Sequence, residues 1–302
     1  MDLIRQSLQN ISIEGLRGHI QALEGIRHPV VAPEALERAA DYIYEALQSL
    51  DYELSEHRFH DGGGEFRNIL ATRLGSRYPN KRAIVLAHYD TVADSPGAND
   101  NASGVAGVLE LARVLKSLQF ERTVQFTCVS LEERSSNKES ICRGSQALAA
   151  YAKTNAWEIE GVINLEEIAF AGDDILQTAP NGLPFEFPEV GDFIAVVGNQ
   201  ASAELVQGFA QSIHQYDIPL PHFPLLVPGN GEALPDSRRS DHASFWDCGY
   251  PAIMVTDTAN FRTPHYHQPS DTLETLNLVF AAAVCRAAGG LLADLTGYSA
   301  KG

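Results

Sequence analysis

Residues 83–87 form a short, uninterrupted apolar run, AIVLA. Runs of this kind are typical of strands that are buried on both faces, as in parallel sheets covered by helices. Residues 123–130 predict a second buried strand, and residues 105–118 carry apolar side chains at helical spacing between the two. This order of strand, helix and strand favours a mostly parallel sheet.

The same alternation extends over the rest of the chain. Further helices are predicted at residues 14–23, 33–50, 144–154, 203–215 and 275–295, and further strands at 52–59, 66–72, 161–165, 193–197 and 252–255. We therefore expect an α/β fold, a three-layer αβα sandwich with a central, mostly parallel (mixed) sheet. No internal repeat or linker is visible, so residues 1–302 are expected to form a single domain. The Pro- and Gly-rich residues 219–235 are expected to form a long loop at a binding rim.

The charge of the chain argues against some classes of partner. It has 22 Lys and Arg against 39 Asp and Glu, a net charge of −17 at pH 7. Such a surface repels phosphate groups, so we expect no binding to nucleic acid or to an anionic membrane. Arg286 and Asp294 interrupt the apolar residues 279–295, which predicts a buried or amphipathic helix. No signal peptide or disulfide framework is recognisable, so a cytoplasmic location is expected.

Common catalytic motifs are missing from the sequence. GxSxG, GxxxxGK[ST], GxGxxG and HExxH do not occur, which gives no support to serine hydrolases, P-loop proteins or short zincins. Instead, acidic and histidine residues follow the predicted buried strands, where function gathers in open α/β sheets. His88 and Asp90 come first, and two residues apart on a strand they share a face. They are either a metal ligand with its supporting carboxylate or a structural pair.

Further candidate residues lie at five other places along the chain. Asp100 lies in a loop before a predicted helix, where Ser103 or Asn101 is expected to be the N-cap. The doublets at 132–133 and 166–167 are either solvated surface pairs or carboxylates that reach a common cleft. His267 precedes the last helix, which Ser270 or Asp271 is expected to cap. Similarly, Ser240 or Asp241 is the expected cap of a helix that follows residue 242.

The joint order of these segments is more specific than any one of them. The series is HYD (88–90), GANDNASG (97–104), LEE (131–133), NLE (164–166), SDHASF (240–245), GYPAI (249–253) and YHQPSDT (266–272). It resembles the bacterial leucyl aminopeptidase and aminopeptidase Y family of co-catalytic zinc peptidases, over residues 88–276. The resemblance implies a zinc-exopeptidase-like fold.

The resemblance also implies a role for each matching residue. Two Zn²⁺ ions per chain are expected as cofactors. The five implied zinc ligands are His88, Asp100, Glu133, Glu166 and His267, with Asp100 bridging the ions. Asp90 is expected to support His88, and Glu132 to act as general base for a zinc-bridging hydroxide that attacks a peptide carbonyl. The Asp100–Asn101 peptide bond is expected to be cis.

This chain departs from the family at the fourth motif. Glu166 stands where the family most often has Asp, and Glu167 and Ala169 replace the usual Met and Gly. The charges of the implied site nevertheless balance. Two Zn²⁺ ions carry four positive charges, and three ligand carboxylates with one hydroxide carry four negative ones, which makes burial tolerable.

Three functions remain open at this stage. The first is an aminopeptidase that acts on peptides, the second a single-zinc acyl transferase resembling glutaminyl cyclases, and the third a non-catalytic relative. Arg238, Arg239 and Arg262 lie near the motifs, where they either bind a substrate carboxylate or form structural salt bridges. The sequence does not indicate an oligomeric state.

Overall fold

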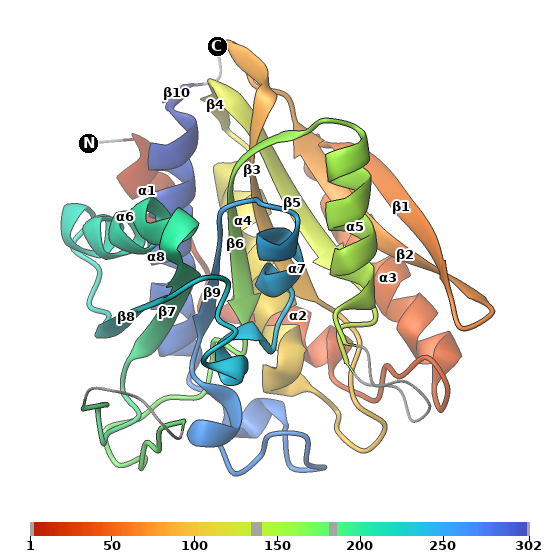
Figure 1. Ribbon diagram of the computed structural model, residues 1–302, viewed down its shortest axis with the longest axis vertical. Helices are drawn as coiled ribbons and strands as arrows, with labels where there is room; N and C mark the ends of the chain where they lie inside the picture. Colours follow the sequence, from red (N-terminus) through yellow and green to blue (C-terminus); the bar gives the residue numbers. More distant parts are fainter. Residues whose placement is uncertain (1–2, 134–140, 181–185, 301–302) are drawn as a thin grey trace.

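The protein is built around one eight-stranded sheet, as the computed structural model of residues 3–133, 141–180 and 186–300 shows (Figure 1). The strand order is β1-β2-β5-β3-β6-β9-β7-β8. The strands are β1 (Glu53–Asp61), β2 (Gly64–Arg73), β3 (Tyr78–His88), β5 (Arg122–Val129), β6 (Glu158–Glu166), β7 (Ile194–Asn199), β8 (His222–Val227) and β9 (Ala252–Thr256). The four strands β5, β3, β6 and β9 are parallel neighbours. On either side of this central group, β2 runs antiparallel to β5 and β7 runs antiparallel to β9.

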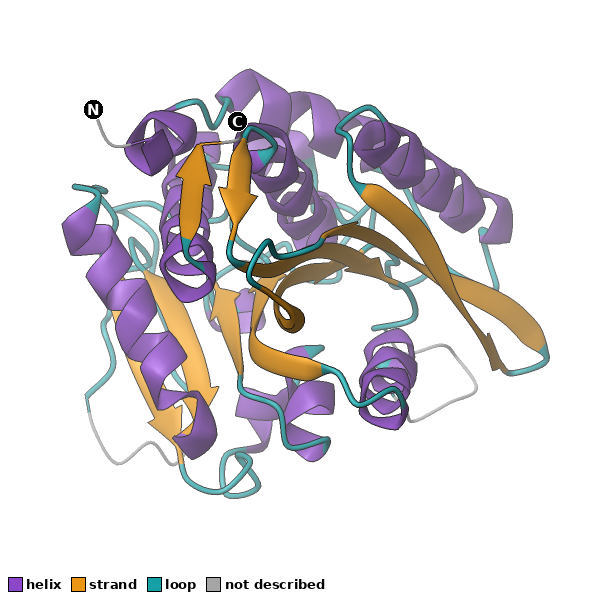
Figure 2. Cartoon of the chain, turned by 90° about the horizontal axis from the view of Figure 1, so that it is seen from above, coloured by secondary structure: helices purple, strands orange, loops and turns teal. Residues whose placement is uncertain are grey.

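Helices cover both faces of the sheet, which confirms the predicted α/β fold with a mixed sheet (Figure 2). One core cluster joins the sheet to α1 (Leu3–Gln9), α2 (Ile13–Leu23), α3 (Pro33–Gln48), α4 (Gly104–Leu115), α6 (Ala203–Gln215) and α8 (Leu278–Thr296). A second cluster on the other face joins it to α5 (Arg143–Thr154) and α7 (His242–Asp247). Residues 83–87 are fully buried between these layers, as their apolar run predicts.

The structure corrects the prediction of a continuous loop at residues 219–235, because β8 lies within it. The sequence HFPLLV hides this strand, since Pro224 has no N–H for a sheet. Among the described strands, β8 pairs with β7 alone and is an edge strand, where proline is tolerated.

Several helix limits also differ from the prediction. α4 ends at Leu115, three residues before its predicted end, and the next residues form β4 (Leu118–Phe120), which pairs with β10 (Tyr298–Ala300). α8 begins at Leu278 rather than at residue 275 because Asn277 caps it. Helix α1 was not predicted.

Helix α8 is, within the described ranges, the one helix long and apolar enough to cross a membrane. Of its most apolar 18-residue window, 78% is buried inside the protein. Its side chains belong to the first core cluster, in agreement with the predicted buried helix.

The loop after β3 is held by the buried guanidinium of Arg27, which is 2% exposed. Arg27 donates hydrogen bonds to five backbone carbonyl oxygens, those of Leu23, Gly25 (2.8 Å), Tyr89 (2.7 Å), Pro96 (2.9 Å) and Gly97 (3.0 Å). These contacts fix the course of the chain between β3 and α4. That segment carries Asp90 and Asp100, so Arg27 connects the stability of the fold to the candidate site.

Replacing Arg27 with methionine is expected to lower the free energy of unfolding by about 3 kcal/mol, because buried carbonyl oxygens lose their donors. Urea unfolding followed by circular dichroism measures this change. Arg17→Met on the exposed side of α2 is the matched control, where an ion pair of 3.9 Å with Glu14 is lost; its effect should stay within about 0.5 kcal/mol. Equal stability of the two variants would contradict the assigned role of Arg27.

Candidate active site

Asp100 lies at the centre of two groups of metal-binding side chains. Its Oδ1 is 3.3 Å from Nε2 of His88, and the same nitrogen is 3.3 Å from Oε1 of Glu166. Its Oδ2 is 3.2 Å from Nε2 of His267, which is 3.0 Å from Oε1 of Glu133. In each group the three candidate ligand atoms lie within 4.8 Å of one another. The structure thus brings together the five residues from His88 to His267 that the sequence singled out.

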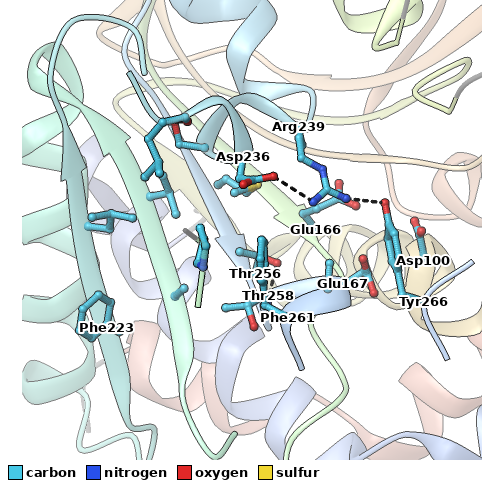
Figure 3. Close-up of a pocket in the computed structure, with 18 of the residues that line it drawn as sticks. Asp100, Glu166, Glu167, Phe223, Asp236, Arg239, Thr256, Thr258, Phe261 and Tyr266 are labelled. Carbon is cyan, nitrogen blue, oxygen red and sulfur yellow. Dashed lines mark hydrogen bonds and ion pairs between the residues drawn. The ribbon is translucent and has the colours of Figure 1, made fainter. Parts of the chain in front are cut away.

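The fold explains why these residues meet. His88 and Glu166 are the last residues of the parallel strands β3 and β6, and Glu133 follows the neighbouring strand β5. The carboxyl ends of parallel strands lie at one edge of the sheet. Asp100 reaches this edge from the loop before α4, and His267 from the segment between β9 and α8. Figure 3 shows Asp100, Glu166, Glu167 and Tyr266 around the end of a pocket.

The spacing of the ligand atoms fits zinc. Tetrahedral Zn²⁺ with bonds of about 2.0–2.1 Å to nitrogen and oxygen separates its ligand atoms by about 3.3 Å. The measured separations between the histidine nitrogens and the carboxylate oxygens are 3.0–3.3 Å. A mixed set of imidazole and carboxylate ligands also suits this metal. Glu166, one methylene longer than the Asp that the resemblance implies, places its Oε1 3.3 Å from Nε2 of His88.

Asp90 makes two contacts that the sequence did not predict. Its carboxylate accepts hydrogen bonds from the backbone N–H groups of Glu132 and Glu133, each 3.0 Å long. Its Oδ1 also lies 3.5 Å from Nδ1 of His88, on the ring side opposite the ligand atom. Asp90 is therefore placed to orient His88 and the segment that carries both glutamates.

The pKa values of the side chains in the two ligand groups are shifted by their burial and by one another's charges. The pKa of Asp100 is lowered despite its burial, because His267 and His88 donate hydrogen bonds to it. Burial opposes a proton on His88, yet Glu166 and Asp100 raise the pKa of this imidazole well above its usual range. Burial and the charge of Asp100 raise the pKa of Glu133 to about 7. Three carboxylates thus face two imidazoles here, an excess of negative charge that favours cations between them.

Glu132 has a different environment from the ligand carboxylates. It is buried, and burial raises its pKa well above the usual range; His88 opposes this shift, whereas the charges of Glu133 and Glu166 add to it. A carboxylate with raised proton affinity at the edge of a metal site is suited to accept and return a proton.

Two residues that were expected to cap helices instead form hydrogen bonds to residues of the candidate site or to the loop that carries them. Asp271 does not cap α8; it accepts hydrogen bonds from the backbone N–H groups of Asn99 (2.8 Å) and Asp100 (3.1 Å). Neither Ser240 nor Asp241 caps α7 with its side chain, and Ser240 donates to Oε2 of Glu166 at 2.6 Å.

Before α4, the cap role falls to Asn101 rather than to Ser103. Oδ1 of Asn101 accepts from the N–H of Gly104 at 3.1 Å, whereas Ser103 donates to the carbonyl oxygen of Asn99 at 2.7 Å. The peptide bond between Asp100 and Asn101 is cis, as expected.

A pocket opens beside the two ligand groups, and its far part is apolar (Figure 3). Asp100, Glu132, Glu133 and Glu166 line one end. The apolar lining includes Phe187, Ala195, Val197, Phe223, Leu225 and Met254, mainly from β7, β8 and β9. Residues 219–235, which were expected at a binding rim, contribute Phe223, Leu225 and Leu234 to this lining. The contributions of β7 and β9 were not predicted, because a buried apolar strand gives no local sign that it faces a pocket.

Among the three arginines near the motifs, Arg239 is the one that lines the pocket. It donates to the hydroxyl of Tyr266 at 2.9 Å, and the ring of Tyr266 stacks on His267 at 3.8 Å between centroids. Arg238 instead forms two hydrogen bonds with Asp247, and Arg262 is buried against backbone and amide oxygens. Arg238 therefore forms a structural salt bridge, as one of the two interpretations predicted, whereas Arg262 has a structural role through hydrogen bonds to Gln177 and to the carbonyl oxygen of Phe170. Tyr266 also lines the pocket. Its position next to His267 in the sequence was the signal that could have identified it as a site residue.

Comparison with known proteins identifies the family. The chain matches Peptidase family M28 over residues 68–290. It is 32% identical over 295 residues to the uncharacterized protein YfbL of Escherichia coli K12, covering 89% of this chain and 84% of that protein. It is 24% identical over 305 residues to a probable leucine aminopeptidase of Trichophyton verrucosum, covering 97% of this chain and 76% of the relative.

A further relative shares part of the sequence, and two solved structures share the fold. A probable zinc metalloprotease of Pyrenophora teres is 29% identical over 247 residues, which are 72% of this chain and 49% of the relative, so the chain spans about half of that protein. The aminopeptidase of Aneurinibacillus sp. strain AM-1 has the same fold, with a TM-score of 0.75, 16% identity, and coverage of 97% and 96%. Porphyromonas gingivalis glutaminyl cyclase also shares the fold, with a TM-score of 0.71, 18% identity, and coverage of 94% and 99%.

The family match spans more than half of the chain and includes both ligand groups. This chain belongs to peptidase family M28, a family of zinc peptidases.

Proposed function

We propose that this protein is a co-catalytic aminopeptidase that binds two zinc ions and hydrolyses the N-terminal peptide bond of its substrates. The observation that carries the proposal is the division of Asp100 between two ligand groups, with one carboxylate oxygen in each. A carboxylate that faces two complete sets of ligands is suited to bridge two metal ions. The similarity to the probable leucine aminopeptidase of Trichophyton verrucosum supports the same activity. It also supports placing this chain near the leucyl aminopeptidase branch of the family.

The proposed ligands are His88, Asp100 and Glu166 for one ion, and Asp100, Glu133 and His267 for the other. When bound, such a pair of ions polarises the substrate carbonyl and makes water a stronger nucleophile near neutral pH. The protein side chains supply the remaining requirements. Asp90 faces Nδ1 of His88 at 3.5 Å, Ser240 holds Glu166 by a hydrogen bond, and Asp271 holds the backbone of Asp100.

Glu132 moves the proton in the proposed reaction. Its carboxylate accepts a proton from the attacking water and then delivers it to the departing amine, so the leaving group departs neutral. Its raised pKa helps it to hold the proton between the two steps. The hydroxyl of Tyr266 lies in the same pocket, and the hydrogen bond from Arg239 fixes its position.

The pocket suggests which substrates are accepted. Its apolar lining suits an uncharged side chain on the residue that is released, and Glu167, a lining carboxylate that belongs to neither ligand group, suits a polar α-amino group. Together these features favour removal of an apolar N-terminal residue.

A glutaminyl-cyclase-like transferase is the second candidate, because a glutaminyl cyclase shares the fold. The presence of two ligand groups instead of one speaks against it. A non-catalytic relative is disfavoured because the ligands and Glu132 are all present. If the protein cyclises peptides with an N-terminal glutamine, hydrolyses no peptide bond and binds one zinc ion per chain, the transferase function would replace the proposed one.

Removing one ligand of the second group is expected to halve the zinc content. After dialysis, elemental analysis should find two zinc ions per chain in the wild type and about one in His267→Ala. His265→Ala is the matched control, since His265 belongs to neither ligand group and contacts Ser270 instead. A chelator should abolish aminopeptidase activity, and zinc should restore it. Equal zinc content in the two variants would refute the second ligand group.

Glu132→Gln is expected to lower kcat on aminoacyl anilides at least about hundredfold, because the amide does not accept the proton. The zinc content should not change. Glu158→Gln, an exposed position at the start of β6, serves as control and should keep wild-type kcat. Turnover of the Glu132→Gln variant at the wild-type rate would show that another group is the base.

Ala195→Leu is expected to fill part of the apolar pocket. Because each methylene in such a pocket is worth roughly 10–200-fold in specificity, kcat/KM for a phenylalanyl anilide should fall about tenfold or more. The value for an alanyl anilide should change less than about threefold, which makes it the internal control. A uniform loss on both substrates would mean that the pocket does not hold the released side chain.

A further inference from the structure

The backbone that carries Glu132 is fixed from both sides. Its N–H donates to Asp90 at 3.0 Å, and its carbonyl oxygen accepts from the N–H of Cys142 at 2.7 Å. Next to it, the carbonyl oxygen of Leu131 accepts from the N–H of Arg143 at 2.9 Å. The segments 131–132 and 142–143 are therefore paired along their backbones, at the point where α5 begins.

The side chain of Cys142 adds a contact to the carboxylate itself. Its Sγ donates to Oε1 of Glu132 at 3.4 Å, within the reach of a sulfur donor. Cys142 is 3% exposed and has a φ of 58°, a left-handed conformation that residues with a β-carbon rarely adopt. This conformation sets the direction in which the thiol leaves the backbone.

We propose that the Cys142 thiol is a positioning residue that holds the Glu132 carboxylate in the orientation needed for proton transfer. The inference rests on the proposed role of Glu132 as general base. A thiol is a weak, uncharged donor, so it restricts the rotation of the carboxylate without neutralising its charge. A lysine or arginine at this place would lower the proton affinity that a base needs.

The surroundings keep the thiol in its donor form. Burial raises the pKa of Cys142 well above its usual range, and the negative charge of Glu132 adds to this. The thiol consequently stays protonated and does not compete with Glu132 for the proton of the reacting water. The competing interpretation is that Cys142 only fills space in the core, as the buried Cys128 does.

Kinetics of three variants separate these interpretations. Cys142→Ala should lower kcat on a leucyl anilide about tenfold, with KM within about twofold and unchanged zinc content, because a base must be held within hydrogen-bond reach. Cys142→Ser keeps a donor and should recover kcat to within about threefold of the wild type. Cys128→Ala, the matched loss of a buried sulfur, should leave kcat unchanged. A kcat of Cys142→Ala equal to that of Cys128→Ala would overturn the proposal.

Infrared spectroscopy tests the contact without any turnover. The S–H stretching band that disappears in Cys142→Ser should lie at lower frequency than the bands of the other thiols, and should move upward in Glu132→Ala. A band that Glu132→Ala leaves in place would overturn the proposal. If the wild-type protein hydrolyses no aminoacyl substrate, the proposed function falls, and the band alone then decides whether Cys142 holds Glu132.

Discussion

The attraction between buried carboxylates and divalent cations is the interaction on which the rest of the site depends. Asp100, Glu133 and Glu166 converge within a region that has little contact with water. Without compensating charge, such a cluster is costly, since desolvated carboxylates repel one another. Two histidines at 3.0–3.3 Å provide part of the compensation, and a pair of Zn²⁺ ions would provide the rest.

The sheet makes this concentration of charge possible. The parallel strands β3, β5 and β6 end side by side. His88 and Glu166 are the last residues of β3 and β6, and the 132–133 glutamates lie in the loop that follows β5. Long-range contacts then fix each group: Asp90 holds the glutamate segment, Ser240 holds Glu166, and Asp271 holds the Asp100 backbone. The rigid part of the protein thus sets the spacing of the ligands, while β7 and β8 provide the apolar wall of the pocket.

The central strands could be predicted from sequence because their signals are local, whereas the roles of the site residues followed from the joint order of the motifs and the family resemblance. An apolar run marks a doubly buried strand, and the polar residues after it mark the catalytic edge. The predictions of helix caps were wrong for Asp271 and Ser240. Each of these short side chains could cap the nearby helix, but instead it makes a hydrogen bond to a residue distant along the chain, Asp271 to the backbone of Asn99 and Asp100 and Ser240 to Glu166. The edge strand β8 was hidden by Pro224, and the contacts of Arg239 with Tyr266 and of Cys142 with Glu132 depend on loops that only the folded chain brings together.

Anomalous diffraction at the zinc absorption edge, from crystals of the zinc-loaded protein, tests the central claim most directly. The account predicts two peaks about 3.5–4 Å apart, one among His88, Asp100 and Glu166 and the other among Asp100, Glu133 and His267. Asp100 should contribute one carboxylate oxygen to each. A single peak, or peaks outside these two groups of side chains, would contradict it.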